Sequence, residues 1–267
     1  MNTTSTCNCE TEPRAKATNE RPRYYARQLV TPEDLTLDQD YFRDRLRRHN
    51  LFLHGWGIVC GARVAPAAAP GQAAGQQAPW KVIIRRGYIL GPYGDEIWIA
   101  KDVCFDVRTK CATSGQSNPD DCGCVEVQPA PATDTTRYIA VRYKENKSRL
   151  VRVPLGGCGC ETNACEYTRY ADGYEICVID ECPTASEQAP PELDSLNRGE
   201  PPECPPAATS PWVVLAGFTV TEEGRVELEE CVQCRRQVLG FGKYWWSCNV
   251  TQGDDQGSRE KVGQGDR

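Results

Sequence analysis

The chain has 267 residues and a formal net charge of −6 at pH 7, with a pI near 5.2. An acidic chain whose arginines are scattered argues against a broad nucleic-acid-binding surface. No run approaches the roughly 20 apolar residues that a membrane-spanning helix needs, so we expect no membrane span.

Residues 1–22 are polar and contain no apolar stretch typical of an export signal. We predict that they form a flexible arm. The chain is therefore expected in the cytoplasm. Thiols stay reduced in that compartment.

The clearest element is a helix predicted over residues 32–54. Thr31 is a good N-cap, and Pro32 suits the first helical position. Apolar or aromatic side chains then recur along one side of the helix. They are Leu35, Phe42, Leu46, His49 and Leu53. This stripe predicts an amphipathic helix that packs on a sheet.

The rest of the chain predicts short strands joined by turns and long loops rich in Cys and Pro. Strands are predicted over residues 58–60, 80–86, 88–90, 96–100, 137–143, 150–153, 174–179, 212–220 and 225–228. Residues 144–147 are predicted to be a polar turn. Residues 65–79 are rich in Ala, Pro and Gln, and we predict a loop too poor in bulky apolar groups to pack.

One long helix against many short strands predicts a β-rich α+β fold. The helix would pack on antiparallel sheets in a sandwich- or barrel-like arrangement. We expect a single domain over residues 23–250 and a disordered polar tail over 251–267.

Sixteen cysteines require an explanation. Two identical Cys-Gly-Cys pairs, Cys122 with Cys124 and Cys158 with Cys160, could supply the four thiolates of a tetrahedral zinc site that joins two loops. Such a closed site has no open coordination position, so it predicts a structural role. Disulfides, or unpaired thiols in loops, are the alternatives.

Three further cysteines could join a metal site or form disulfides, and the sequence leaves both open. They are Cys165, Cys231 and Cys234. The last two form a Cys-x-x-Cys pair, but no βαβ pattern surrounds it as a thioredoxin-like redox motif requires. Another three, in or beside apolar strands, are predicted to pack as buried thiols. These are Cys60, Cys104 and Cys177.

His49 and His54 are the only histidines. Residues five apart on an α-helix do not share a face, so we expect a packed imidazole at His49 and a turn-shaping role for His54. Motifs of serine hydrolases, phosphate-binding loops and zinc peptidases do not occur in the sequence. We therefore predict that the chain is not an enzyme. The alternatives are a metal-dependent or thiol redox protein using the cysteine clusters, and a carbohydrate- or surface-binding β module.

Several motifs occur together between residues 23 and 61. In chain order they are Arg-Tyr-Tyr, Gln-Leu-Val-Thr, Glu-Asp-Leu, Arg-His-Asn and Leu-His-Gly-Trp-Gly. Residues 87–97 then read Gly-Tyr-Ile-Leu-Gly-Pro-Tyr-Gly-Asp-Glu-Ile, and later segments at 167–175 and 215–218 suit the same pattern. The set resembles uncharacterised proteins associated with contractile phage tails and phage-tail-like injection systems, over most of residues 23–240. The resemblance implies a structural, baseplate-associated subunit whose partners are other protein subunits, with no catalytic residues. Such a subunit would be assembled in the cytoplasm and could leave it as part of a released particle.

Overall fold

The structure is a computed structural model, and it describes residues 20–69, 76–113, 135–152, 165–183, 199, 204, 206–229 and 234–240. The arm before residue 20, the two Cys-Gly-Cys pairs, Cys231 and the tail over 251–267 lie outside the described residues. The predictions made for them stay predictions.

The described chain contains one α-helix, α1 (Pro32–His49), which continues as a π-helical turn, η1 (Asn50–His54). The strands are β1 (Gly57–Gly61), β2 (Val64–Ala68), β3 (Gln77–Ile84), β4 (Gly87–Leu90), β5 (Glu96–Ile99), β6 (Val103–Asp106), β7 (Cys111–Thr113), β8 (Arg137–Arg152), β9 (Cys165–Ile179), β10 (Val213–Val220) and β11 (Val226–Glu229). They form three antiparallel sheets: sheet 1 (β1-β4-β5), sheet 2 (β2-β3-β6) and sheet 3 (β11-β10-β8-β9-β7). The predicted β-rich α+β class is confirmed, and the sheets do not close into a barrel.

The larger of two buried clusters in the described part of the chain lies between the inner faces of the three sheets, and the smaller one contains Ala140, Val214 and Cys234. Alternation along β8 turns Ile139 and Val141 toward the larger cluster, and β10 contributes Leu215 and Phe218. These side chains are almost completely buried. Burial of this kind supplies the main favourable contribution to folding, so the sheets form a firm base for whatever projects from them.

Strands occupy parts of two predicted loops. Residues 65–68 lie in β2 and residues 77–79 in β3, whereas residues 70–75 lie outside the described residues. Ala67 and Ala78 are buried there because small side chains still fill space in a paired strand. The polar stretch 144–147 does not turn. It continues β8, which pairs with β9 from Tyr138 to Arg152.

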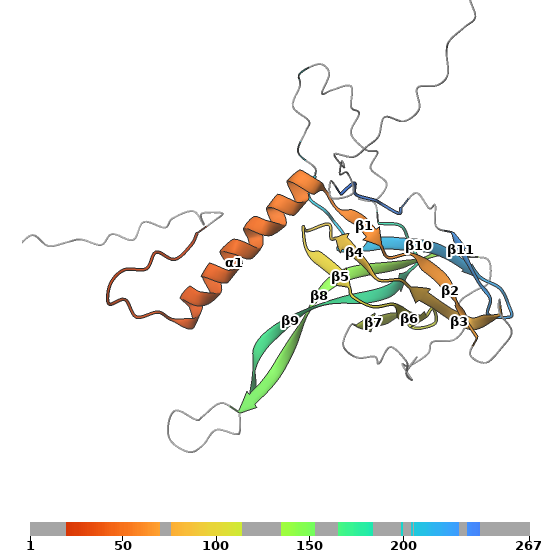
Figure 1. The fold of residues 1–267 in the computed structure, drawn as a ribbon, viewed down its shortest axis with the longest axis horizontal. Helices are drawn as coiled ribbons and strands as arrows, with labels where there is room; N and C mark the ends of the chain where they lie inside the picture. The colour runs from red at the N-terminus through yellow and green to blue at the C-terminus, as the bar shows by residue number, and fades with distance from the viewer. Residues whose placement is uncertain are drawn as a thin grey trace, which may run out of the picture.

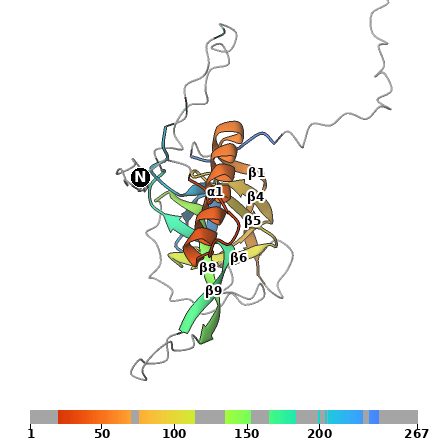
Figure 2. The ribbon, with the colours of Figure 1, turned by 90° about the vertical axis from the view of Figure 1, so that its left-hand side faces the viewer.

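Helix α1 begins as predicted but does not lie on a sheet. Thr31 and Asp34 form a reciprocal capping box at its N-terminus. Figures 1 and 2 show the helix extending away from the sheets, on the same side as the outer half of the β8–β9 hairpin. Within the described ranges, no helix combines the length and the apolar character needed to cross a lipid bilayer.

Candidate docking site

Helix α1 is attached to the core at its C-terminal end, on the turn between β4 and β5. The side-chain amide of Asn50 donates to the carbonyl oxygen of Gly94 at 3.0 Å. Arg47 forms an ion pair with Asp95 at 2.6 Å, although the geometry is not that of an aligned hydrogen bond. Gly94 has a φ of +80°, and a Cβ there would overlap the carbonyl oxygen of Arg47. Glycine therefore lets the helix end approach the turn closely.

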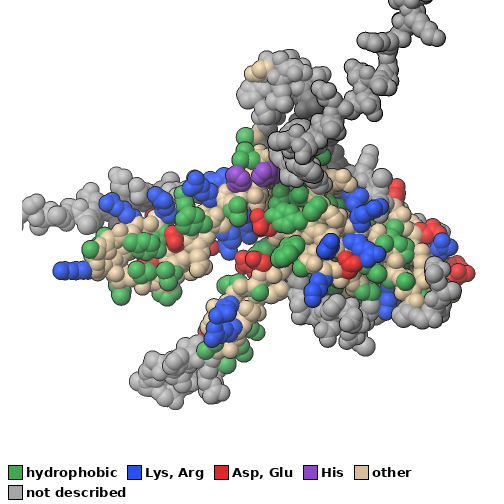
Figure 3. All heavy atoms as spheres, in the orientation of Figure 1, with side chains coloured by type: hydrophobic (Ala, Val, Ile, Leu, Met, Phe, Trp, Pro, Cys, Tyr) green, Lys and Arg blue, Asp and Glu red, His purple; other side chains and the backbone are tan. Residues whose placement is uncertain are grey.

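The apolar stripe of α1 faces solvent. None of the α1 residues is buried. Leu35, Phe42 and Leu46 are 53%, 56% and 50% exposed, and Leu53 in η1 is 66% exposed. The prediction that this stripe packs on a sheet is wrong, because the helix leaves the domain at Asn50. Figure 3 shows hydrophobic side chains exposed along the helix. Contiguous apolar surface of this kind marks contact sites in soluble proteins.

A second projection is the outer half of the β8–β9 hairpin, residues 145–152 and 165–172, here called the ribbon. Beyond residues 142 and 175, neither strand pairs with a third strand in the described part of the chain. Leu150, Tyr167 and Tyr170 are exposed on it. A two-stranded ribbon is only marginally stable by itself in water, so an apolar ribbon is well suited to packing against another surface.

A cleft of about 360 Å³ lies between the end of α1 and the base of the ribbon. Phe42 and Leu46 line it on the helix side, and Tyr143 and Asp172 line it on the ribbon side. The hydroxyl of Tyr143 donates to Asp172 at 2.6 Å. Burial and the nearby carboxylates raise the pKa of Tyr143, so its hydroxyl remains a donor at neutral pH. The cleft can accept an apolar side chain against Phe42 and Leu46, with polar groups on the ribbon side.

An ion pair holds the helix and the ribbon at a fixed separation. Arg43 on α1 lies 3.1 Å from Glu145 on β8 and 2.7 Å from Asp40 on its own helix. Such exposed pairs contribute about 1 kcal/mol or less each. Their effect is therefore to orient the helix rather than to stabilise the fold.

The outer face of sheet 3 carries both disulfides of the described chain. Cys111 and Cys177 are directly opposed on β7 and β9. The second disulfide joins Cys182, just after β9, to Cys234. The segment that follows Cys234 runs beside β1, where the N–H of Ile58 donates to the carbonyl of Arg236 at 2.9 Å. Covalent links thus fasten β7 and the segment 234–240 to the central sheet.

The buried carboxylate of Glu175 lies beside the first disulfide. It accepts hydrogen bonds from Arg142 at 2.8 Å and from Lys144 at 2.7 Å. Burial acts to raise the pKa of Glu175, but these two cations outweigh it and hold the pKa below its usual value. Glu175, Cys111 and Cys177 are close enough to ligate one metal ion. The two sulfurs are joined to each other, however, and the carboxylate is already paired.

The structure corrects several predictions about individual cysteines. Cys60 is exposed, and Cys177 is buried but disulfide-bonded, so neither is a buried free thiol. Cys104 is half-buried. Cys165 is exposed at the ribbon. Cys234 is disulfide-bonded, which was one of the two alternatives predicted for it. The sequence offered no signal for these pairings. Cys111 and Cys177, 66 residues apart, meet through the β7–β9 register, and Cys182 and Cys234, 52 residues apart, meet where two segments outside the strands come together.

The structure corrects the prediction for His49 and does not test the turn-shaping role predicted for His54. Both are exposed, and their rings stack edge-to-face with centroids 5.4 Å apart. The π-helical turn explains the contact, because a wider turn brings residues five apart onto one face. His49 is therefore not a packed core residue.

Comparison with models of known protein families and with curated proteins finds no match. The function proposed for the chain therefore rests on its own residues and geometry.

Another exposed feature is an aromatic pair on the outer face of sheet 1. Trp98 is 72% exposed and lies directly opposite Tyr88 across the β4–β5 ladder. Burial and the neighbouring Glu96 raise the pKa of Tyr88 to about 12. An exposed flat ring of this kind is suited to contact with a sugar or with another protein.

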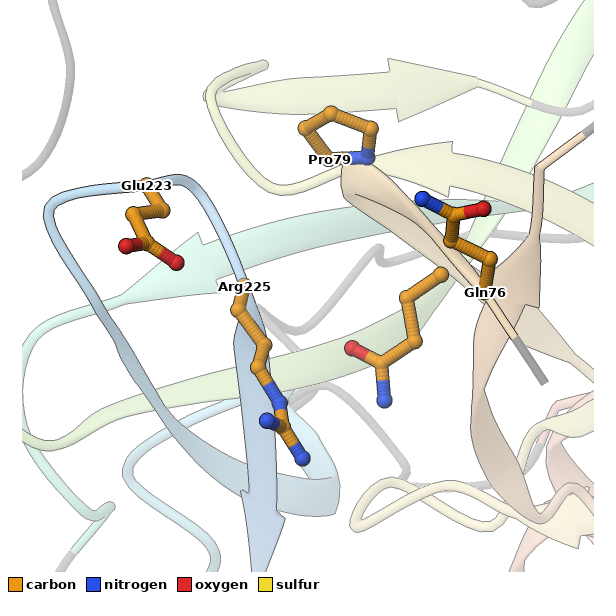
Figure 4. Close-up of a pocket in the computed structure, with 5 residues that line it drawn as sticks. Gln76, Pro79, Glu223 and Arg225 are labelled. Atoms are coloured by element: carbon orange, nitrogen blue, oxygen red, sulfur yellow. The ribbon is translucent and has the colours of Figure 1, made fainter.

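A pocket of about 420 Å³ opens between the start of β3 and the β10–β11 turn. Gln76 and Pro79 line one side, and Glu223 and Arg225 line the other. In Figure 4 the guanidinium of Arg225 points away from the carboxylate of Glu223. These side chains do not form a coupled acid–base pair.

Proposed function

We propose that this chain is a non-enzymatic structural subunit of a phage-tail-like contractile injection particle, assembled at its baseplate. One observation carries the proposal: a disulfide-fastened β core bears two projections, α1 and the ribbon, that expose apolar side chains to solvent. The resemblance of residues 23–61 and 87–97 to tail-associated proteins gives the class of particle.

The physical support lies in how the projections are held. An amphipathic helix with an exposed apolar face gains stability only when another surface covers that face. The attachment of α1 through Asn50, Gly94 and Asp95 fixes its direction. A rigid base with two oriented contact elements is what a subunit needs to join neighbours at defined angles.

The test is to purify tail-like particles from cells that encode this chain, with and without its gene. We expect the chain in the particles in a fixed ratio to the baseplate subunits, and incomplete baseplates in its absence. A core-only variant lacking residues 20–54 should fold but stay out of the particles. Complete, contracting particles made without the chain would refute the proposal.

A second candidate, a carbohydrate- or surface-binding β module, is favoured by Trp98 and Tyr88. Glycan binding by the purified chain that disappears in Trp98→Ala would support it. Tyr93→Ala, at another exposed aromatic residue of the same sheet region, is the matched control. Binding unchanged in Trp98→Ala would remove the aromatic pair from consideration.

The zinc site proposed at Cys122, Cys124, Cys158 and Cys160 remains a proposal, since these residues lie outside the described part of the chain. One zinc ion per chain with no fast-reacting thiol would support a structural site. A single cysteine that reacts rapidly at neutral pH would instead favour the thiol redox alternative.

A further inference from the structure

Charge is segregated along α1. The first half, residues 32–40, contains Glu33, Asp34, Asp38 and Asp40 and no basic residue. The second half, residues 41–49, contains four arginines and one aspartate. Two such helices repel when they lie parallel, because each half then faces a half of the same charge. They attract when they lie antiparallel, because each acidic half then faces a basic half.

The exposed stripe has the spacing of a coiled-coil seam. Leu35, Gln39, Phe42, Leu46, His49 and Leu53 follow one another at alternating steps of four and three residues. Asp38 and Arg45 lie on the same flank of this seam, one heptad apart. Neither has an ion-pair partner among the residues that the structure describes.

From the seam and the charges together, we infer that α1 is a homodimerisation element that pairs antiparallel with α1 of a second copy of this chain. This inference names one partner of the helix within the proposed assembly role, and it rests on that role. The contact is isologous: the same patch is used on both copies.

A specific register follows from the charges. With Leu35 level with Leu46 of the second copy, Gln39 lies level with its Phe42. Asp38 then comes within about 3 Å, measured along the helix axis, of the second copy's Arg45, since each residue rises 1.5 Å. Twofold symmetry repeats this contact at the other end. The midpoint of the pair coincides with the midpoint of α1 (Pro32–His49), so the whole helix is used.

The apolar seam residues stay at least half exposed, although Phe42 and Leu46 also line the cleft whose other wall is the base of the ribbon. Arg21 on the lead-in segment lies over the ring of Tyr41, which is on the opposite side of the helix from the seam. The cleft beside Phe42 and Leu46 is where Leu35 of the second copy would enter.

The first experiment measures the mass of the purified full chain by sedimentation over a range of concentrations. We expect a monomer–dimer equilibrium in the wild type and a monomer in Leu46→Asp. Leu37→Asp is the matched control, because Leu37 is an exposed leucine of the same helix that points away from the seam. It should leave the equilibrium unchanged. Circular dichroism checks folding, and no α1 side chain is buried, so the β core should persist in both variants.

The second experiment exchanges charges. Asp38→Arg places like charges opposite each other at both ends of the pair, and so does Arg45→Asp. Each should weaken dimerisation about tenfold. The double variant Asp38→Arg/Arg45→Asp should recover it. An equimolar mixture of the two single variants should form a heterodimer, since one then has two positive and the other two negative flanking residues.

A wild-type chain that stays monomeric at high micromolar concentration overturns the pairing, as does a dimer that ignores both charge exchanges. If that monomer still enters the particle, the assembly role stands and α1 has a different partner. Loss of both dimerisation and particle entry in Leu46→Asp, but not in Leu37→Asp, supports the two proposals together.

Discussion

Gly94→Ala should release α1 from the core without unfolding the core. The new Cβ would overlap the carbonyl oxygen of Arg47 and lie 2.6 Å from its carbonyl carbon. Alanine in the left-handed region costs about 1 kcal/mol, and forced overlap of this kind costs about 1–3 kcal/mol more. The contacts that seat the helix end, the Asn50 hydrogen bond and the Arg47–Asp95 ion pair, contribute about 2 kcal/mol together. The strain exceeds what holds the helix end in place.

Hydrogen exchange provides the assay. In Gly94→Ala, the amide of Gly55, which caps η1 by donating to the carbonyl of Leu51 at 3.2 Å, should lose protection. Amides of β8 and β10 should keep theirs. Gly91→Ala in the same turn is the control, because its Cβ would meet Asp95 at an ordinary 3.5 Å and its φ is not left-handed. Equal exchange in the two variants, or equal loss of protection in β8, would refute the reasoning.

Three other outcomes can be measured by unfolding in denaturant. Replacing both Cys111 and Cys177 by alanine should lower the free energy of unfolding by about 4 kcal/mol under non-reducing conditions, given their separation of 66 residues, whereas Cys60→Ala should change it little. Glu175→Gln should cost about 2 kcal/mol at pH 7. Since the pKa of Glu175 is depressed in the folded state, the stability advantage of the wild type over Glu175→Gln should be lost as the pH falls below 4.5, the ordinary pKa of a glutamate. An equal difference in unfolding free energy between the two proteins at pH 7 and pH 3 would contradict the ion-pair account. Phe218→Ala should cost about 3–5 kcal/mol, because that side chain is fully buried between the sheets, and a loss below 1 kcal/mol would show that the core is not continuous there.

Local signals in the sequence predicted local structure well. The Thr31 cap and the left-handed glycine at 55 act within one turn of the chain, so the helix limits at 32 and 54 could be read directly. The strand positions of β4 and β5 followed in the same way from short apolar runs ended by a turn.

Which segments contact each other depends on residues far apart in the chain, and these contacts could not be predicted from the sequence. The stripe at Leu35 and Phe42 indicates that the helix needs an apolar neighbour, but not whether that neighbour is in the same chain. The polar residues 144–147 look like a turn because no apolar side chain alternates along them, although residues 144–146 are half-buried in the paired strand. Disulfide partners such as Cys182 and Cys234 depend on strand order, which no spacing encodes.

The ribbon also determines how a mechanical load on this molecule would be distributed among its strands. Tension applied at its tip runs down β8 and β9 together, so the bonds between those two strands bear little shear. The load is carried instead by the two flanking ladders. In one, β10 is hydrogen-bonded to β8, and in the other, β7 is paired with β9 and crosslinked to it by the Cys111–Cys177 disulfide. In the proposed contractile particle, such a subunit could stay attached to its neighbours during contraction, because a disulfide crosslinks one of the two ladders that bear the load.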